Sequence, residues 1–481
     1  GAMVATTVTL QQQASTPPPH LTLLDSVLVA PSAPAPETAS LPLTFFDVFW
    51  LNSTPVERVF FYRLTSDDAA GAGDGITAIL SNLRTSLSRA LGVFYPLAGR
   101  LRLAPGTDDR HQLHYQQGDS VTFAVAEYDV DVDDLATDEP REVAKILPLV
   151  PTLPAGGAVL AVQATVLRGG RGLAVGLVLH HAACDGASCM RFLHTWAWAA
   201  AATDARAPPP PVINRGLVED PSCLYDVFVK GQAASSSTID NDNKRDDVKM
   251  ADDLLLATFT LSQQDIERVK DVVVVAAGAR PPRCSSLVAT LGFVWSCHQR
   301  AKDDAASNVG SGGGETPSTY FILPIDHRSR VKPGPIPAEY FGNCLGAAMH
   351  AAPKNQLAAA DASGIVAGCT AVATAIGKAV GEGGIGSPEL WKEMIRQAVA
   401  SGGGLLTVAG SPRFRVYDID FGFGRPAKVE VVSVARTGAL AVAESRPSCG
   451  GGGIEVCISL PPDDMRRFQN CFRKAITWLR H

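Results

Sequence analysis

The sequence has no CxxC pair and no cysteine–histidine cluster at zinc-site spacing, although it contains 10 cysteines. Proteins that depend on a disulfide framework are much shorter than 481 residues, because a long chain can bury a core of its own. Several of the cysteines lie in apolar stretches, where a free thiol behaves as a small hydrophobic group. We therefore expect no metal site, no disulfide framework and a reducing compartment.

The sequence also has no excess of basic residues, because it contains 42 lysines and arginines and 48 aspartates and glutamates. Nucleic acids and anionic membranes attract clustered basic faces, and the sequence shows none. The longest apolar runs, such as 173–179 and 272–277, are far shorter than the ~20 residues that span a bilayer. The first residues lack the basic and apolar regions of a secretory signal. We expect a cytoplasmic monomer that binds neither nucleic acid nor membrane.

The chain does have length and apolar content. Its 481 residues, 46% hydrophobic and 19% charged, predict two large domains. The composition changes at 203–214, which holds Pro208–Pro211, and again at the polar segment 234–249. We predict an N-terminal domain over 3–205, a crossover linker over 206–250 with a mobile polar part, and a C-terminal domain over 251–481. Gly1 and Ala2 resemble the remnant of a cleaved tag and are left out.

Hydrophobic periodicity predicts the main elements. Leucines at 80, 83, 87 and 91 recur at helical spacing, and a second helical pattern follows residue 188. Residues 158–167 and 172–180 are two β-like runs joined by a turn, and the second is apolar on both faces, as an internal strand would be. In the C-terminal half we predict helices over 262–274 and 285–302, and strands over 319–324, 428–434 and 454–460.

The most specific pattern is His180-His181-Ala-Ala-Cys-Asp185-Gly186, between a predicted buried strand and a helix. Successive strand side chains point to opposite faces, so at most one histidine continues the strand into a given cavity. A histidine, with an unperturbed pKa near ~6.5, can accept a proton at neutral pH. Asp185 can fix the turn, and Gly186 permits backbone angles that other residues resist. The alternative interpretation is a helix N-cap beside two core histidines.

Three other segments do not match the functional motifs that they partly resemble. Gly186-Ala-Ser188-Cys-Met190 departs from a nucleophile elbow at its last position. The acidic run 129–134 lacks the glycine and the glutamate of a calcium-binding loop. The glycines at 310–314 are not followed by the lysine of a phosphate-binding loop.

Two motifs in the C-terminal half extend the pattern around His181: Tyr340-Phe-Gly-Asn343-Cys344 and Asp420-Phe-Gly422-Phe423-Gly424. In this order, the three motifs resemble those of the plant BAHD acyltransferases. Tyr-Phe-Gly-Asn-Cys is similar to the extra motif of the branch that acylates anthocyanins and other flavonoid or phenolic glycosides. The resemblance spans nearly the whole chain, including 41–47 and 94–100. It implies an α/β fold of two similar-sized domains, each with a mixed β-sheet flanked by helices, and an active-site channel at the domain interface (chloramphenicol-acetyltransferase-like).

The resemblance also implies roles for individual residues. His181 would act as the general base, with Asp185 as its catalytic partner in the motif. Asp185 would point away from substrate and pair with Arg328, for which surface solubility is the competing explanation. Gly186, Asp420 and Gly422 would be structural. Phe423 replaces the tryptophan of the family and has no N–H to donate.

Substrate-binding roles are implied for four further residues. Ser285 lies where the family contacts CoA, although it could simply cap a helix. Ser411 lies in a segment similar to the loop at the acyl end of the channel, although a Ser-Pro turn is an equal alternative. Asn343 and Arg413 complete the set. No bound cofactor is implied; acyl-CoA would be a co-substrate, and the acceptor would be a phenolic or flavonoid glycoside.

The acyl donor is the open question. A malonyl group carries a free carboxylate and favours an arginine or lysine in the channel, but Ala187 and Ser188 beside the motif are neutral. Arg191 lies too far into the helix, so the cation would have to come from Arg413 or from a lysine of the second domain. We expect malonyl-CoA, which is common in this branch. The alternatives are a hydroxycinnamoyl-CoA donor with a glycoside or amine acceptor, a non-catalytic CoA or ligand binder, and a condensation-type domain.

Overall fold

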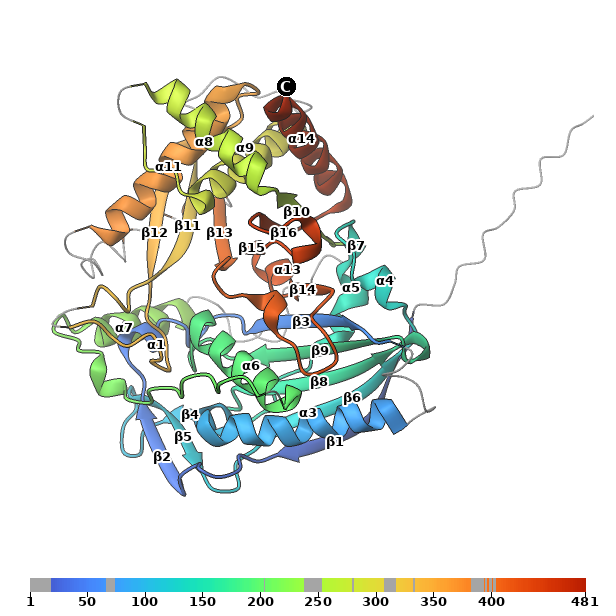
Figure 1. The fold of residues 1–481 in the computed structure, drawn as a ribbon. Coiled ribbons are helices and arrows are strands. Elements are labelled where there is room, and N and C mark those ends of the chain that lie inside the picture. Colours follow the sequence, from blue (N-terminus) through green and yellow to red (C-terminus); the bar gives the residue numbers. More distant parts are fainter. Residues whose placement is uncertain are drawn as a thin grey trace, which may run out of the picture.

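The computed structural model describes residues 19–65, 74–202, 204–237, 253–278, 281–306, 317–331, 334–381, 393, 396–397, 400 and 404–481. Figure 1 shows two α/β units, with the N-terminal unit below and the helices α8, α9, α11 and α14 gathered at the top. Each unit is built on a mixed sheet flanked by helices, which confirms the predicted fold class. The polar segment 238–249 and the glycines at 310–314 lie outside the described residues.

The first sheet has six strands in the order β1-β6-β8-β9-β3-β14, in which β6 and β8 are parallel. β8 and β9 form the predicted hairpin, and every residue of β9 is buried because β9 is an internal strand. A smaller sheet has the order β2-β5-β4. The strands of these two sheets are β1 (Leu21–Val29), β2 (Thr38–Pro42), β3 (Val56–Arg63), β4 (Arg100–Leu103), β5 (His111–Gln116), β6 (Val121–Tyr128), β8 (Leu160–Leu167), β9 (Gly172–Leu179) and β14 (Lys428–Val431).

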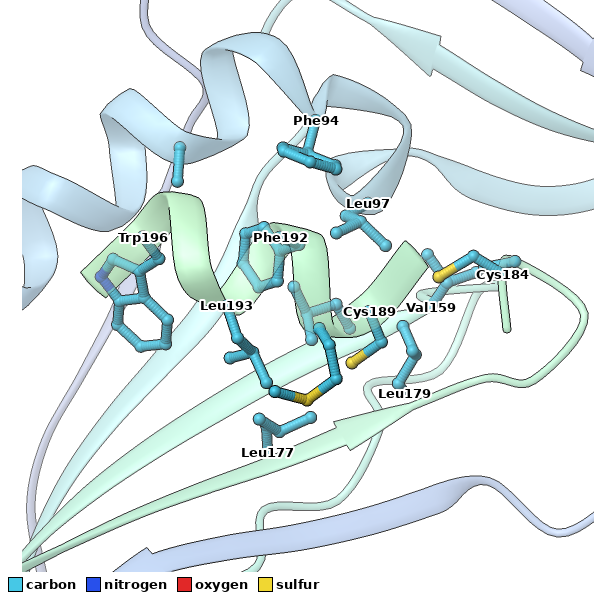
Figure 2. Packing of buried hydrophobic residues seen from close by; sticks show 14 of the residues in the cluster. Phe94, Leu97, Val159, Leu177, Leu179, Cys184, Cys189, Phe192, Leu193 and Trp196 are labelled. Carbon is cyan, nitrogen blue, oxygen red and sulfur yellow. The ribbon is translucent and has the colours of Figure 1, made fainter. Parts of the chain in front are cut away.

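Two long helices cover this unit. The leucine pattern forms α3 (Asp74–Val93), and the segment after the histidine motif forms α6 (Gly186–Ala201). Figure 2 shows Leu193 and Cys189 of α6 over Leu177 and Leu179 of β9, with Phe192 below Phe94 and Leu97. The core therefore holds the start of α6 rigidly against the end of β9. Shorter helices are α1 (Phe45–Val48), α4 (Val132–Leu135), α5 (Val143–Ile146) and α7 (Leu224–Ser237).

The second sheet has seven strands in the order β12-β11-β13-β15-β16-β10-β7. The predicted helices 262–274 and 285–302 are present as α8 (Gln263–Ala277) and α9 (Ser286–Ala306). The other helices are α10 (Lys354–Leu357), α11 (Ala362–Val380), α13 (Val434–Thr437) and α14 (Pro462–Arg480). The seven strands of this sheet are β7 (Arg141–Glu142), β10 (Leu255–Leu261), β11 (Ser318–Asp326), β12 (Leu345–Pro353), β13 (Leu405–Gly410), β15 (Leu440–Glu444) and β16 (Ile454–Leu460).

Helix α11 is long and apolar enough to cross a membrane by length and composition alone. Ile365, Cys369, Val372 and Ala375 line one face of it at helical spacing and belong to the core of the second unit. That face packs on α9 and β12. Core packing therefore accounts for the apolar residues on this face of α11.

Each sheet contains a strand from the other half of the sequence. β14 pairs with β3 at the edge of the first sheet, and β7 pairs with β10 at the edge of the second. A division of the chain at 206–250 therefore assigns β14 to the C-terminal half although it pairs in the first sheet, and β7 to the N-terminal half although it pairs in the second sheet. Within 206–237, Val212 bridges to Tyr340 and Arg215 is buried, so this part of the crossover is packed.

A buried charge cluster lies where the exchanged strands meet. Arg141 Nη2 of β7 contacts Glu430 Oε1 of β14 at 2.6 Å. Lys428 Nζ of β14 contacts Asp138 Oδ1 at 2.6 Å and Glu455 Oε2 of β16 at 3.8 Å. Arg141, Glu430, Lys428 and Glu455 are all buried. The cluster therefore joins both sheets through compensated charges.

Candidate active site

The two histidines of the motif follow the last residue of β9. His180 still belongs to the sheet, because its backbone N–H donates to the carbonyl of Val159 at 2.8 Å. The imidazole of His180 turns back on the chain and its Nδ1 accepts from the backbone N–H of Ala182 at 3.2 Å. His181 begins the turn that leads into α6, and its side chain is partly buried. The turn thus separates the two imidazoles.

Asn343 fixes the imidazole of His181. Its Nδ2 donates to Asp47 Oδ1 at 3.0 Å and to the backbone carbonyl of His181 at 2.8 Å, which turns its Oδ1 toward His181 Nδ1 at 3.2 Å. An amide oxygen only accepts, so Nδ1 carries the proton and Nε2 keeps its lone pair. The sequence implied a substrate contact for Asn343. In the structure its side chain is buried and holds the imidazole of His181.

The carboxylate of Asp47 anchors Asn343 through hydrogen bonds. This carboxylate is fully buried and accepts from the backbone N–H of Asn343 at 2.9 Å and from both the N–H and the hydroxyl of Thr44 at 2.8 Å. Arg215 forms an ion pair with it and also donates to the carbonyl of Ala183 at 3.0 Å. The chain Arg215–Asp47–Asn343–His181 therefore joins four separate segments.

Trp50 lies flat on His181. The two ring centroids are 3.9 Å apart and the planes differ by 15°. Among the described residues, no partner accepts from the buried indole Nε1–H of Trp50. Burial lowers the pKa of His181, against the opposing effects of Asp185 and of the Asn343 hydrogen bond. His181 is therefore neutral at neutral pH and able to accept a proton.

Asp185 faces away from the imidazole and pairs with Arg328. Its two oxygens accept from the Arg328 guanidinium at 2.8 and 3.0 Å, a bidentate geometry. Asp185 Oδ1 also accepts from the N–H of Ser188 and caps α6, and Oδ2 accepts from the N–H of Cys344 at 3.1 Å. Arg328 in turn reaches the carbonyls of Tyr340 and Gly342. The pair clamps the start of α6 to the segment that carries Asn343.

Gly186 is the first residue of α6 and does not have a positive φ, so the expected need for unusual backbone angles is wrong. The physical reason for glycine is space. A Cβ at this position would lie 2.8 Å from ring carbons of Phe414. Any larger residue would push the 411–414 loop away from the turn that carries His181.

The Asp420–Gly424 motif forms a tight turn on the first unit. Asp420 Oδ1 accepts from the N–H groups of Gly422 at 2.8 Å and Gly424 at 3.0 Å, and both glycines have positive φ. A Cβ on Gly422 would lie 3.2 Å from the Cα of Ala201, at the end of α6. Phe423 packs edge-on against Tyr62, with ring centroids 5.0 Å apart.

The remaining implied substrate-binding residues lie apart from this centre. Ser285 is exposed and its hydroxyl accepts from the N–H of Val288 at the start of α9 in the second unit. Ser411 accepts from the N–H of Arg413 at 3.2 Å in the loop after β13, and Arg413 is exposed. The loop reaches the centre through its neighbour Phe414, which contacts Gly186.

The structure brings His181, Asp185, Gly186, Asn343 and Arg328 together, whereas Asp420, Gly422, Ser285, Ser411 and Arg413 line other parts of the molecule. Sequence reasoning missed Asp47, Trp50 and Arg215. Asp47 and Trp50 lie in or just after a segment whose resemblance to the family was noted, but Arg215 carries no local signal. No group of three or more potential metal ligands occurs among the described residues.

Known proteins resemble this chain over nearly its whole length. A model of the Transferase family matches residues 19–475. The chain is 30% identical over 464 residues to malonyl-CoA:anthocyanidin 5-O-glucoside-6''-O-malonyltransferase of Arabidopsis thaliana, covering 94% of this chain and 97% of the relative. It is 27% identical over 475 residues to coumaroyl-CoA:anthocyanidin 3-O-glucoside-6''-O-coumaroyltransferase 2 of the same plant, covering 94% and 97%. The structure of vinorine synthase shares the fold, with a TM-score of 0.65 at 20% identity over 93% of this chain and 96% of that one.

Proposed function

From the premise that this chain belongs to the Transferase (BAHD) family and is a CoA-dependent acyltransferase, we propose that it moves a malonyl group from malonyl-CoA to a hydroxyl group of an anthocyanin, flavonoid or phenolic glycoside. Acyl-CoA is its co-substrate. The single observation that carries the proposed chemistry is His181, whose Nδ1 is held by Asn343 so that Nε2 is free as a base. The relative with 30% identity, named as a malonyltransferase, supports the donor.

The reaction follows from this geometry. His181 Nε2 takes the proton of the acceptor hydroxyl as its oxygen attacks the thioester carbonyl carbon. A tetrahedral intermediate forms, the C–S bond breaks, and the CoA thiolate leaves with the proton that the imidazolium returns. Asn343 and Asp47 hold the imidazole in one tautomer through both steps. Asp185 keeps the turn in place through Arg328, because both of its carboxylate oxygens accept hydrogen bonds from the guanidinium.

We further propose that Ser285 and Arg413 contact the donor or acceptor from the second unit, and that Ser411 meets the acyl group. The enzyme would act as a cytoplasmic monomer without nucleic-acid or membrane partners. A hydroxycinnamoyl-CoA donor is the second candidate, because a coumaroyltransferase at 27% identity covers the chain equally well.

The test is a donor-by-acceptor screen of the purified protein with the His181→Ala variant and the matched His180→Ala variant. We expect malonylated glycoside as the main product. His181→Ala should lower kcat by about 10²–10⁴-fold, because a positioned general base contributes that much. His180→Ala should keep most activity, because the Nδ1 of His180 is occupied by a hydrogen bond from the local backbone.

The control is CoA binding, which both variants should retain. If the wild-type protein binds CoA but acylates nothing, it is a ligand binder and the proposal fails. If His181→Ala keeps more than about a tenth of wild-type activity, His181 is not the base. A tenfold preference for coumaroyl-CoA in kcat/KM would replace the malonyl donor and leave the chemistry standing.

A further inference from the structure

One buried cation in the described part of the chain lacks a carboxylate partner. Arg141, Arg215, Arg328 and Lys428 each form a salt bridge. Arg58 of β3 is 4% exposed and forms none. Its Nη1 donates to the thioether of Met190 at 2.8 Å, and its Nε–H has no partner among the described residues. Burying a charge without a counter-charge is costly, so this guanidinium needs a functional explanation.

Arg58 lines a cavity of about 30 Å³ between the two sheets. The cavity contains a second unsatisfied polar atom, because the buried hydroxyl of Thr258 in β10 also lacks a hydrogen-bond partner within the described ranges of the chain. Apolar walls come from Phe414, Val442 and Ala443. A water molecule needs roughly 10–15 Å³, so this space suits a small polar group and is too small for an aromatic ring.

The acidic groups near Arg58 do not neutralise it by direct contact. Glu455 lines the same cavity but already bonds Arg446 at 2.9 Å and the Tyr417 hydroxyl at 2.6 Å. Glu444 interacts with Arg58 only from beyond salt-bridge distance, and burial raises the pKa of Glu444. Burial likewise raises the pKa of the neighbouring Cys189 thiol, which stays neutral.

The cavity lies beside the turn that carries His181. Arg58 pairs across the sheet with Leu177, which lies two residues before the end of β9 and four residues before His181 in the sequence. The Arg58 side chain reaches Met190 in the second turn of α6. Phe414 lines the cavity on one side and contacts Gly186 at the start of α6 on the other. Phe414 and α6 therefore connect the cavity with the turn that carries His181.

We propose that Arg58 and Thr258 form a carboxylate subsite that binds the free carboxylate of the malonyl group while its thioester carbon lies at His181. This inference rests on the malonyl donor proposed above. A guanidinium gives strong charge-assisted hydrogen bonds to a carboxylate, and the Thr258 hydroxyl supplies another donor. An acetyl group leaves the subsite without a carboxylate, and the ring of a coumaroyl group does not fit it.

The experiment compares kcat/KM for malonyl-CoA and acetyl-CoA with one glycoside acceptor. The variants are Arg58→Met, Arg58→Lys and Thr258→Val, with Arg63→Met as the matched control, because Arg63 lies exposed at the end of the same strand. Arg58→Met should lower the malonyl-to-acetyl ratio at least 50-fold and leave the acetyl-CoA rate within threefold. Arg58→Lys and Thr258→Val should lower the ratio about 3–10-fold, because each removes part of the hydrogen bonding. Arg63→Met should leave it unchanged.

The outcomes separate this proposal from the proposed function. If the wild-type protein uses malonyl-CoA but the ratio stays unchanged in Arg58→Met, the subsite is wrong and the malonyl donor stands. If malonyl and acetyl rates fall together in all three variants, Arg58 only supports the fold. If the wild-type protein does not turn over malonyl-CoA, both proposals fail. Should Arg58→Met not fold, the ratios of Arg58→Lys and Thr258→Val decide the question.

Discussion

A single aromatic residue, Trp50, covers one face of the proposed base. Its ring lies 3.9 Å from the imidazole of His181 and nearly parallel to it. When His181 takes a proton during the reaction, the imidazolium gains attraction to the face of the indole, an effect of about 1 kcal/mol. Trp50 should therefore favour the charged form of the imidazole, which the proposed reaction generates and the free enzyme at neutral pH does not hold.

We predict that Trp50→Leu lowers kcat about 5–10-fold, because this cation–π attraction is lost. Trp50→Phe should lose less, since a ring remains over the imidazole. Steady-state kinetics at pH 8, together with melting temperatures, provide the measurement. If Trp50→Leu and Trp50→Phe lower kcat equally, or if only KM changes, Trp50 does not stabilise the imidazolium.

For individual residues, the sequence predicts site residues that are close together in the chain. It does not predict contacts between residues that only folding brings together. His181, Asp185 and Gly186 stand in one short motif, so their proximity follows from the strand–turn–helix pattern. Asp47 and Arg215 meet Asn343 only because segments more than 100 residues apart converge. The unpaired state of Arg58 is likewise a property of its surroundings, and no spacing in the sequence encodes it.

Among the elements, helix α6 depends on a clamp at its first turn. Asp185 caps the helix and binds Arg328, which follows β11 in the second unit. Removing one partner leaves a buried charge without compensation, which costs up to ~3–5 kcal/mol. Because the same residues hold the segment around Asn343, the loss should disturb the orientation of His181 as well.

We therefore predict that Asp185→Ala and Arg328→Met each lower the free energy of unfolding by ~3–5 kcal/mol and also lower kcat. The double variant should be less destabilised than the sum of the two, because neither charge is then left unpaired. Urea unfolding of the four proteins gives the coupling energy. An Asp185→Ala variant that keeps its stability but loses all turnover would instead assign direct chemistry to Asp185.

Helices and strands whose apolar residues repeat with a clear period were predictable from the sequence. The pairing of strands that lie far apart in the chain was not. The leucine repeat of α3 and the fully apolar sequence of β9 are enough to predict that these elements are buried. β14 was found as a strand, but its place in the first sheet was not, because strand pairing depends on long-range contacts. The short β7 was missed, since its two residues give no period.

For the whole molecule, the exchange of β7 and β14 joins the two units more tightly than a linker would. The buried charges of Arg141, Lys428, Glu430 and Glu455 lie between the sheets and belong to both halves of the sequence. Neither unit can separate without breaking these ion pairs and opening a sheet edge. The two units should therefore unfold together.

We predict a single unfolding transition in urea, with tryptophan fluorescence and far-ultraviolet circular dichroism giving the same midpoint. Glu430→Gln should lower that midpoint for both probes equally, because it leaves Arg141 and Lys428 without their shared carboxylate. Glu142→Gln, in an exposed ion pair with Lys145, is the control and should have little effect. Two separate transitions in the wild-type protein would show that the units are independent.

The position of β14 also has a consequence for synthesis on the ribosome. The inner neighbour of β3, β9, ends at residue 179, but the edge partner of β3, β14, begins at residue 428, about 249 residues later. At translation speeds of roughly 5–20 residues per second, the nascent first sheet waits about 12–50 s with that edge unpaired. An exposed strand edge is a template for wrong pairing with other chains. Folding of this enzyme in the cell should therefore depend on chaperones that shield the nascent chain until its last fifty residues are being made.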